Sequence, residues 1–207
     1  MNDQSPHGDQ TLADLIGSRL CHDLVNPLGA IGNGVELIEM TGSARGPEMA
    51  LIRDAVRDAQ ARVRFLRVAF GAAGSQQIMS AREARATALA PWQDSRLTLD
   101  WAVPGDLPRL GVKLGYLMLL CAETALPMGG SLRIGLDPSG NWQVTASGPR
   151  LSLDEALWSV LRFGMASAGR PLRPSEAQFP ALHAAVTPLD KTINYVAQDD
   201  RLTIATA

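Results

Sequence analysis

The chain has 207 residues, 46% of them hydrophobic, with 19 basic and 21 acidic residues and a formal net charge of −2 at pH 7. This content supports a sizeable core in one or two domains. The chain has no excess of positive charge that would indicate nucleic acid or an anionic membrane as its partner, so we expect neither. The polar N-terminus MNDQSPHGDQ lacks the apolar segment of a secretory signal, so we expect a cytoplasmic protein.

Two further patterns exclude other classes of protein. The longest apolar run, residues 114–127, is interrupted by Glu123 and falls short of a membrane span, so it predicts a buried helix. Cys21 and Cys121 form no CxxC pair and no ligand cluster. We therefore expect two small core residues in a reducing compartment, and no metal site.

The first predicted element is a long helix that contains SRLCHDLVNPLGAIGNGVELI at residues 18–38. It should end near Gly42, where TGSARGPE supplies glycines for a C-terminal cap, and Pro47 suits the first position of the next helix. The aliphatic residues of the first helix recur every three or four positions, which is helical periodicity: Ile16, Leu20, Leu24, Leu28, Ile31, Val35 and Ile38.

A second helix follows, and GAAGS at residues 71–75 ends it. Its apolar residues form a heptad-like seam suited to supercoiled packing: Met49, Ile52, Val56, Ala59, Val63, Leu66 and Phe70. Residues 1–75 are therefore predicted to be an antiparallel helical hairpin. Two helices alone bury too little surface, so we favour a dimeric four-helix bundle built from two copies of the chain. The alternative is that the rest of this chain covers the apolar stripe.

The remaining segment, residues 76–207, is predicted to be a second domain of the α+β class, an α/β sandwich with helices on one face of a mostly antiparallel sheet. The periodicity and turn residues predict four helices: one from Ser80 with a capping box to Glu83, and others over 108–126, 151–163 and 176–186. They also predict a strand over 96–103, a strand pair over 131–147 that turns at 137–140, and two final strands over 191–198 and 201–206.

The first helix carries one histidine, His22, away from its apolar face. On a helical wheel the centre of the aliphatic stripe lies roughly 200° from His22, so the imidazole is predicted to face solvent. Asp23 follows directly, Asn26 lies one turn on, and Pro27 cannot donate a backbone hydrogen bond to the carbonyl of Asp23. An exposed imidazole whose second nitrogen is held by a carboxylate is a nucleophile with a fixed tautomer, and phosphoryl transfer needs mainly such access and positioning.

The segment HDLVNPL at residues 22–28 resembles the H-box in the dimerisation and histidine-phosphotransfer domain of sensor kinases, which runs His, acid, two variable residues, Thr or Asn, Pro, Leu. The resemblance implies that His22 is the phosphoacceptor and Asp23 the adjacent acid. It further implies that Asn26 helps to position the phosphoryl group or water, that Pro27 kinks the helix, and that the hairpin forms a dimeric four-helix bundle.

Sensor kinases continue into an ATP-binding domain, and here the sequence departs from them. Residues 117–122 read LMLLCA where the kinases carry N-L-L-x-N-A, so the asparagine that binds Mg²⁺ is missing. The segment TASGPR has Ala146 in place of the adenine-reading Asp of D-x-G-x-G, and no Gly-rich lid of the GLGL type follows. With AETALPMGG at 122–130, the whole chain resembles the ChpT-type bacterial histidine phosphotransferases, whose second domain is a degenerate histidine-kinase ATPase domain.

Candidate partner-binding residues flank His22 on the same helix: Leu15, Ser18, Arg19, Val25 and Leu37. The three apolar ones lie within about 60° of His22 on the wheel, where they either form a docking rim or are covered by the second domain. His183, a lone histidine on a short apolar helix, is expected to be structural. The arginines of the second helix are expected to form a solvated face, some of which can meet an acidic partner.

These features predict a phosphorelay intermediate. The implied partners are a second copy of the chain, the receiver domain of a hybrid sensor kinase upstream, and response-regulator receiver domains downstream. We expect no cofactor of its own, since Mg²⁺ comes with the receiver domain. The alternatives are an ATP-dependent sensor histidine kinase with divergent nucleotide boxes, and a non-catalytic dimeric adaptor.

Overall fold

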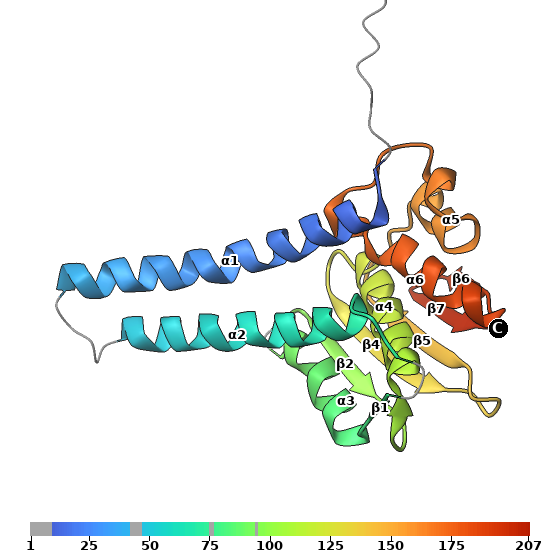
Figure 1. The fold of residues 1–207 in the computed structure, drawn as a ribbon, viewed down its shortest axis with the longest axis horizontal. Helices are drawn as coiled ribbons and strands as arrows, with labels where there is room; N and C mark the ends of the chain where they lie inside the picture. The colour runs from blue at the N-terminus through green and yellow to red at the C-terminus, as the bar shows by residue number, and fades with distance from the viewer. Residues whose placement is uncertain (1–9, 42–46, 75–76, 94) are drawn as a thin grey trace, which may run out of the picture.

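The computed structural model describes residues 10–41, 47–74, 77–93 and 95–207. Two long helices lie side by side and project from a body that contains the sheet and the remaining helices (Figure 1). The helices are α1 (Leu12–Thr41), α2 (Pro47–Ala69), α3 (Ala81–Leu89), α4 (Arg109–Thr124), α5 (Glu155–Phe163) and α6 (Gln178–Val186), with 3₁₀ turns η1 (Ala90–Trp92), η2 (Met165–Ala168), η3 (Pro174–Glu176) and η4 (Thr187–Leu189).

The first helix begins one turn earlier than its aliphatic pattern predicts. Thr11 and Asp14 cap it reciprocally: the Asp14 amide donates to Thr11 Oγ1 at 3.1 Å, and the Thr11 amide donates to Asp14 Oδ2 at 3.1 Å. Such a cap satisfies amides that have no partner inside the helix. Pro47 occupies the first position of α2, as predicted, whereas the predicted glycine cap near Gly42 lies outside the described residues.

The base of the hairpin is part of the main hydrophobic core. Leu15 of α1 and Phe65 of α2 are both buried there. The Phe65 ring stacks on Tyr116 of α4 with centroids 4.5 Å apart, and it meets Trp92 edge-on at 5.2 Å. Aromatic pairs of this kind bury large areas and restrict the relative orientation of the two rings. They therefore fix the base of the hairpin against the body.

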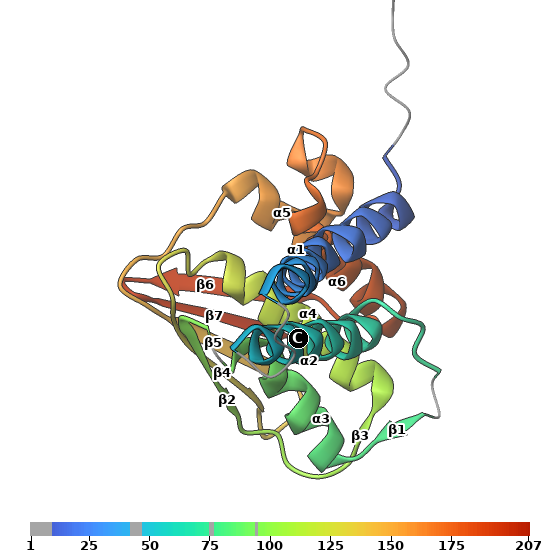
Figure 2. The ribbon, with the colours of Figure 1, turned by 90° about the vertical axis from the view of Figure 1, so that its left-hand side faces the viewer.

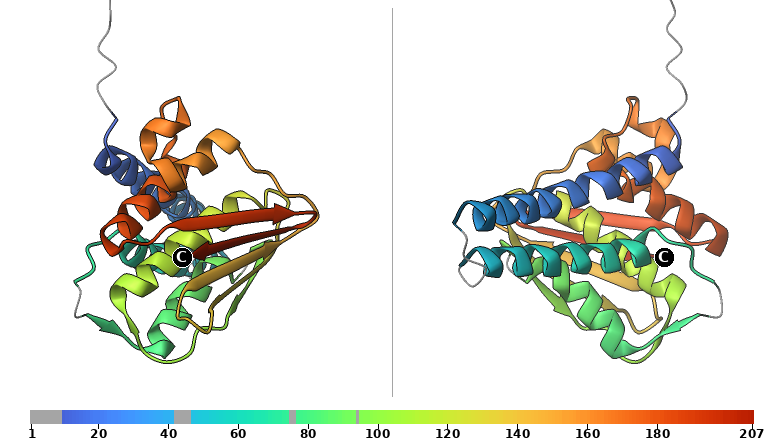
Figure 3. Two further views of the ribbon diagram at one scale, coloured as in Figure 1. Left: turned by 90° about the vertical axis from the view of Figure 1, so that its right-hand side faces the viewer. Right: turned by 60° about the vertical axis from the view of Figure 1, so that its left-hand side comes forward.

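The sheet has five strands in the order β2-β4-β5-β7-β6, in which β2 runs parallel to β4 and every other pair is antiparallel. The helices lie on one side of this sheet (Figure 2), and the opposite face is open in the left view of Figure 3. Both observations confirm the predicted α+β arrangement. The strands are β2 (Leu97–Trp101), β4 (Gly130–Leu136), β5 (Trp142–Ser147), β6 (Ile193–Gln198) and β7 (Arg201–Thr206); β1 (Ile78–Met79) and β3 (Leu107–Pro108) form a separate small ribbon that the sequence did not predict.

Helix α4 is the central helix of the body, and residues along most of its length are buried. It approaches the sheet closely at Gly115, where an added Cβ would lie 2.6 Å from the ring of Trp142. The strand residues alternate as a half-buried sheet requires: Leu132 and Ile134 of β4 face the helix, while Arg133 between them faces solvent. The apolar run at 114–127 is thus a buried helix, as predicted, and no helix among the described residues is long and apolar enough to cross a bilayer.

The two cysteines have different surroundings. Cys121 lies in the core of α4, and burial raises the pKa of its thiol well above the ordinary value. Cys21 is exposed on α1, so the expectation that both are core residues is wrong for Cys21. The wheel places Cys21 nearer to the aliphatic stripe than to His22, so its exposure means that the body does not cover this part of the helix.

Between α5 and α6 the chain is organised around one buried carboxylate. Glu176 accepts hydrogen bonds from both terminal nitrogens of Arg170, at 2.8 and 3.0 Å, and from Nη2 of Arg173 at 2.7 Å. Burial alone would raise the pKa of Glu176, but these charged donors outweigh it and lower the pKa to about 2. The carboxylate therefore fixes the loop that precedes α6.

Replacing Glu176 by glutamine is expected to lower the free energy of unfolding at pH 7 by roughly 2 kcal/mol, because two arginines lose a charged acceptor in a buried setting. The pKa of Glu176 is lower in the folded protein than its ordinary value of 4.5, so its contribution is present above about pH 4.5 and is lost as the pH falls toward 2. Urea unfolding at pH 7 and pH 3 should show the difference between wild type and Glu176→Gln shrink in acid.

The matched control is Asp100→Asn, which removes an exposed ion pair with Arg133 (2.6 Å). Exposed pairs contribute little, so this variant should change the unfolding free energy by less than about 0.5 kcal/mol at either pH. An equal loss of stability in Glu176→Gln at both pH values would contradict the assignment of an ionised, stabilising Glu176.

Candidate functional site

His22 stands on the solvent side of α1, in the part of the helix just beyond its contact with the body. Its side chain is 67% exposed, while that of the adjacent Asp23 is only 10% exposed. The exposure of the imidazole agrees with the helical wheel. An accessible ring therefore stands beside a nearly buried carboxylate.

The ring and the carboxylate are in contact. Nδ1 of His22 lies 3.2 Å from Oδ1 of Asp23. An ionised carboxylate can only accept a hydrogen bond, so in the neutral ring Nδ1 carries the proton and Nε2 keeps its lone pair. The geometry thus leaves Nε2 as the nucleophilic atom of an exposed side chain.

Arg19 holds the other oxygen of Asp23, one turn earlier on α1. Arg19 Nε donates to Asp23 Oδ2 at 2.7 Å, and the arginine side chain is itself only 13% exposed. Its Nη1 donates to the carbonyl oxygen of Ser175 at 2.9 Å and to Oε1 of Gln178 at 3.3 Å. The pairing with Arg19 compensates a carboxylate that would otherwise be buried without a partner.

Asn26 and Pro27 lie one turn beyond His22. Asn26 is exposed, on the turn that follows the imidazole. Pro27 lies inside α1, which continues through it to Thr41, so the proline removes the hydrogen bond to the carbonyl of Asp23 without ending the helix.

The structure separates the predicted partner-binding residues into two groups. Ser18, Val25 and Leu37 are exposed on α1. Leu15 is buried in the core, so of the two alternatives at this position the structure has the second domain covering it. Arg19 is largely buried and engaged with its own chain, and it does not present a free guanidinium to a partner.

A cavity of about 230 Å³ lies behind Asp23, between the hairpin and the body. Burial raises the pKa of Glu123 in its wall, and the Trp92 indole, which donates to Glu123 Oε1 at 3.0 Å, opposes the shift. No local sequence pattern indicates this cavity, because its walls come from segments far apart in the chain. Among the lining residues are Arg19, Asp23, Arg62, Trp92, Glu123 and Gln178.

The positions that the sequence comparison sets against the kinase nucleotide boxes are packed by apolar groups or by backbone. Cys121 and Ala146 are both fully buried. At Gly148 an added Cβ would lie 2.6 Å from the carbonyl oxygen of Gly129 and 2.8 Å from Leu126. The backbone there already contacts the neighbouring turn, and it presents no carboxylate in place of the missing aspartate.

The other candidates have ordinary roles. His183 is half-buried and its Nδ1 lies 3.2 Å from the carbonyl oxygen of Leu161, as expected of a structural histidine that joins α6 to α5. On α2, Arg57 pairs with Asp54 at 3.4 Å and with Asp58 at 3.8 Å, with all three side chains well exposed. These pairs agree with a solvated helix face.

Comparison with known proteins gives three findings. Residues 81–201 match the model of the family described as histidine phosphotransferase C-terminal domain. A curated relative from Brucella abortus (strain 2308), protein phosphotransferase ChpT, is 42% identical over 130 residues, and the match spans 62% of each chain. A 1.7 Å structure of a bacterial phosphotransferase superposes with a TM-score of 0.80 at 31% identity and covers 95% of both chains.

Proposed function

Because the chain belongs to the histidine phosphotransferase family, we propose that it carries a phosphoryl group between receiver-domain aspartates of a bacterial two-component phosphorelay. The observation that carries this proposal is the exposed His22, whose Nδ1 contacts a nearly buried carboxylate and whose Nε2 is thereby left with its lone pair. We propose that Asn26, which is exposed one turn on, helps to position the phosphoryl group or water.

In the proposed reaction, Nε2 of His22 attacks the phosphorus of a receiver aspartyl phosphate in line. The N–P bond forms as the P–O bond to the receiver carboxylate breaks, and the electron pair leaves with that carboxylate. The ring now carries a positive charge with its proton still on Nδ1, and Asp23 stabilises that charge across the 3.2 Å contact. Attack by a second receiver aspartate reverses these steps and regenerates the neutral ring.

The proposed partners follow from this chemistry. The donor is the receiver domain of a hybrid sensor kinase, and the acceptors are response-regulator receiver domains in the cytoplasm. The exposed Ser18, Val25 and Leu37 on α1 are the proposed receiver contacts on this helix. No cluster of three or more His, Cys, Asp or Glu suited to a metal occurs among the described residues, and we propose that the Mg²⁺ of the reaction belongs to the receiver.

We further propose that the hairpin is half of a dimeric four-helix bundle. The body covers only the base of the hairpin, and apolar side chains beyond it are exposed on both helices. Soluble proteins rarely leave such a continuous apolar surface in water, and a second copy provides the matching face. The exposed apolar residues that belong to the aliphatic stripe of α1 and the seam of α2 are Leu28, Val35, Val56 and Val63.

The second domain is proposed to act without ATP, as a second wall of the receiver-binding surface beside His22. Buried Cys121 and Ala146 stand where the kinases have a Mg²⁺ ligand and an adenine-reading carboxylate. Losing a buried hydrogen-bonding partner costs roughly 1–3 kcal/mol, and here several are missing together. Failure to bind ATP would distinguish the proposed phosphotransferase from an ATP-dependent kinase. Phosphorylation of His22 would distinguish it from a non-catalytic adaptor.

The first test replaces His22 by alanine. The variant should accept no phosphoryl group from a phosphorylated receiver, while its unfolding free energy changes by less than about 0.5 kcal/mol because the side chain is exposed. The assay follows an acid-labile, alkali-stable phosphoryl group on the protein, and urea unfolding checks stability. Equal labelling of wild type and His22→Ala would overturn the assignment of the phosphoacceptor.

The second test concerns the dimer. Light scattering at micromolar concentration should give twice the chain mass of 22.1 kDa, and Leu28→Glu, at a position that is 59% exposed on α1, should shift the protein toward monomer. Val196→Glu, at a position that is 58% exposed on β6, is the matched control and should stay dimeric. A wild-type monomer would mean that the exposed apolar face has another occupant.

The third test is calorimetric titration with Mg-ATP, for which we expect no binding at millimolar nucleotide. Deleting residues 76–207 would remove part of the core into which Phe65 packs, so the full chain is used. The control is a sensor kinase with intact nucleotide boxes, titrated under the same conditions. Micromolar binding by this chain would favour the kinase with divergent boxes.

A further inference from the structure

We propose that Arg19 is a positioning residue for phosphoryl transfer, through which the second domain holds Asp23 and thereby sets the tautomer and orientation of His22. The inference rests on the proposed function, because it assigns a role within that transfer. It also gives Arg19 a different role from the partner contact that its place beside His22 suggests.

On one side, Arg19 and His22 share the carboxylate of Asp23. Arg19 Nε lies 2.7 Å from Oδ2, and His22 Nδ1 lies 3.2 Å from Oδ1. Since each oxygen has its own partner, the carboxylate cannot rotate without weakening one of the two contacts. With Arg19 in place, Oδ1 stays directed at the imidazole.

On the other side, Arg19 is fastened to the second domain. Nη1 donates to the carbonyl of Ser175 in η3 at 2.9 Å and to Oε1 of Gln178, the first residue of α6, at 3.3 Å. Gln178 is 1% exposed, and its Nε2 has no hydrogen-bond partner among the described residues. A buried amide left half-satisfied is costly, and the bond from Arg19 satisfies the oxygen of this amide.

The groups that hold Arg19 are themselves held in place. Ser175 and Gln178 lie on either side of Glu176, whose buried carboxylate binds both Arg170 and Arg173. A loop fixed by this cluster presents the Ser175 carbonyl and the Gln178 amide at defined positions. The second domain is therefore connected to His22 through the backbone of the loop, the guanidinium of Arg19 and the carboxylate of Asp23.

The chemistry of the contact requires an arginine. The guanidinium is planar and directs Nε and Nη1 to two different acceptors at once, whereas a lysine ammonium is a compact charge on a flexible stem. A lysine at this position retains a positive charge near Asp23 but cannot reproduce both sets of bonds. Arg19→Lys thus separates the role of the charge from that of the geometry.

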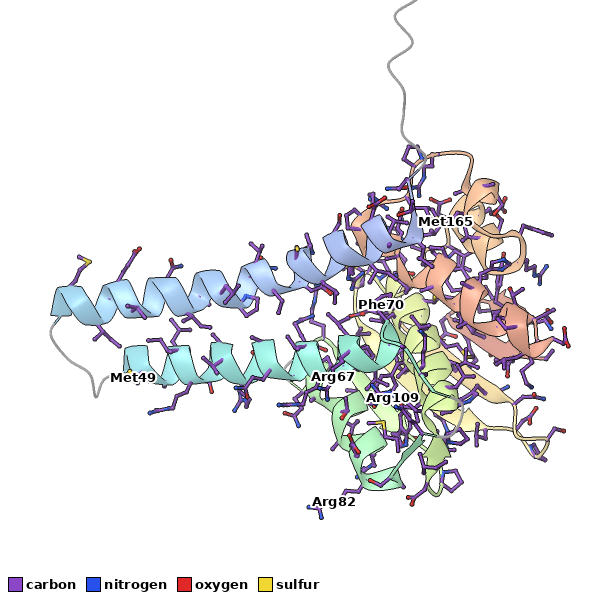
Figure 4. The ribbon with its side chains drawn as sticks, viewed as in Figure 1. Met49, Arg67, Phe70, Arg82, Arg109 and Met165 are labelled. Atoms are coloured by element: carbon purple, nitrogen blue, oxygen red, sulfur yellow. The ribbon has the colours of Figure 1, made fainter. Side chains whose placement is uncertain are left out.

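The experiment compares Arg19→Ala, Arg19→Lys and Gln178→Leu with wild type in two transfer assays. One donor is a phosphorylated receiver domain, and the other is phosphoramidate, which is too small to use a protein docking surface. The control is Arg82→Ala, since Arg82 is exposed on α3 and points away from the body on the side remote from α1 (Figure 4). Circular dichroism melting and light scattering confirm that each variant is folded and assembled as wild type.

For a positioning residue, Arg19→Ala should lower the maximal rate about 10- to 100-fold with both donors, because a small misplacement of a reacting group has effects of this size. The receiver concentration at half-maximal rate should stay within about twofold of wild type. Arg19→Lys should recover part of the loss, Gln178→Leu should lose less than Arg19→Ala, and Arg82→Ala should behave as wild type. A raised half-maximal receiver concentration with unchanged phosphoramidate labelling would instead make Arg19 a receiver contact and overturn the proposal.

A direct readout does not depend on transfer at all. In ¹⁵N NMR spectra of the unphosphorylated protein, at a pH where the ring is neutral, wild-type His22 should show Nδ1 protonated and Nε2 unprotonated. Arg19→Ala should shift the ring toward a mixture of tautomers. An unchanged tautomer in Arg19→Ala would overturn the positioning role of Arg19, even if transfer is impaired. If instead the tautomer shifts as expected but the wild-type protein accepts no phosphoryl group, the proposed function is refuted and the positioning of His22 by Arg19 is not.

Discussion

A carboxylate that is nearly buried needs a cation, and the way Asp23 meets this need links the two parts of the molecule. Its partner is Arg19 on the same helix, at 2.7 Å, but Arg19 has further donors to satisfy and finds its acceptors in Ser175 and Gln178. The cation that pairs with Asp23 on α1 is thereby also bonded to the residues at the start of α6. The exposed imidazole of His22 depends on this arrangement through its contact with Asp23.

The packing at the base of the hairpin also fixes the position of His22. At its base Phe65 stacks on Tyr116 and Leu15 is buried in the core, so the two helices leave the body in a fixed direction (Figure 1). His22 lies just beyond this anchored region. It is close enough to the body for Arg19 to reach the second domain, yet its own side chain is left in solvent. Farther out, the hairpin exposes apolar residues such as Leu28 and Val56, which the body is too short to cover.

The local features of this molecule could be predicted from the sequence, and the long-range ones could not. Spacings of three and four residues identify the helices of the hairpin, and the position of His22 opposite the aliphatic stripe predicts its exposure, because both depend on helical geometry alone. Ser80 caps α3 through the amide of Glu83, as the capping-box pattern predicts. The Thr11–Asp14 cap was missed, although its residue types are those of a helix start.

The bonds between Arg19 and residues 175 and 178 join segments about 160 positions apart, and nothing in their local sequence marks them. For a related reason, helical periodicity leaves open whether the second domain covers Leu15, and the expectation that Cys21 is a core residue is wrong. Helical periodicity gives the direction of a side chain around its own helix but not how far along that helix the body extends. The wheel therefore ranks Leu15 with Val25, whereas in the fold the first is in the core and the second is in solvent.

These contacts also give a reason for the arrangement of the loop before α6. Cys121 and Ala146 are ordinary core residues of the second domain. The loop, in contrast, contains a buried Glu176 held by two arginines, an arrangement that apolar residues often replace at no loss of stability. Stability alone is therefore a weak reason to keep it, and a loop whose fixed backbone receives Arg19 supplies a second one: the precision of the site on α1 depends on the rigidity of the loop.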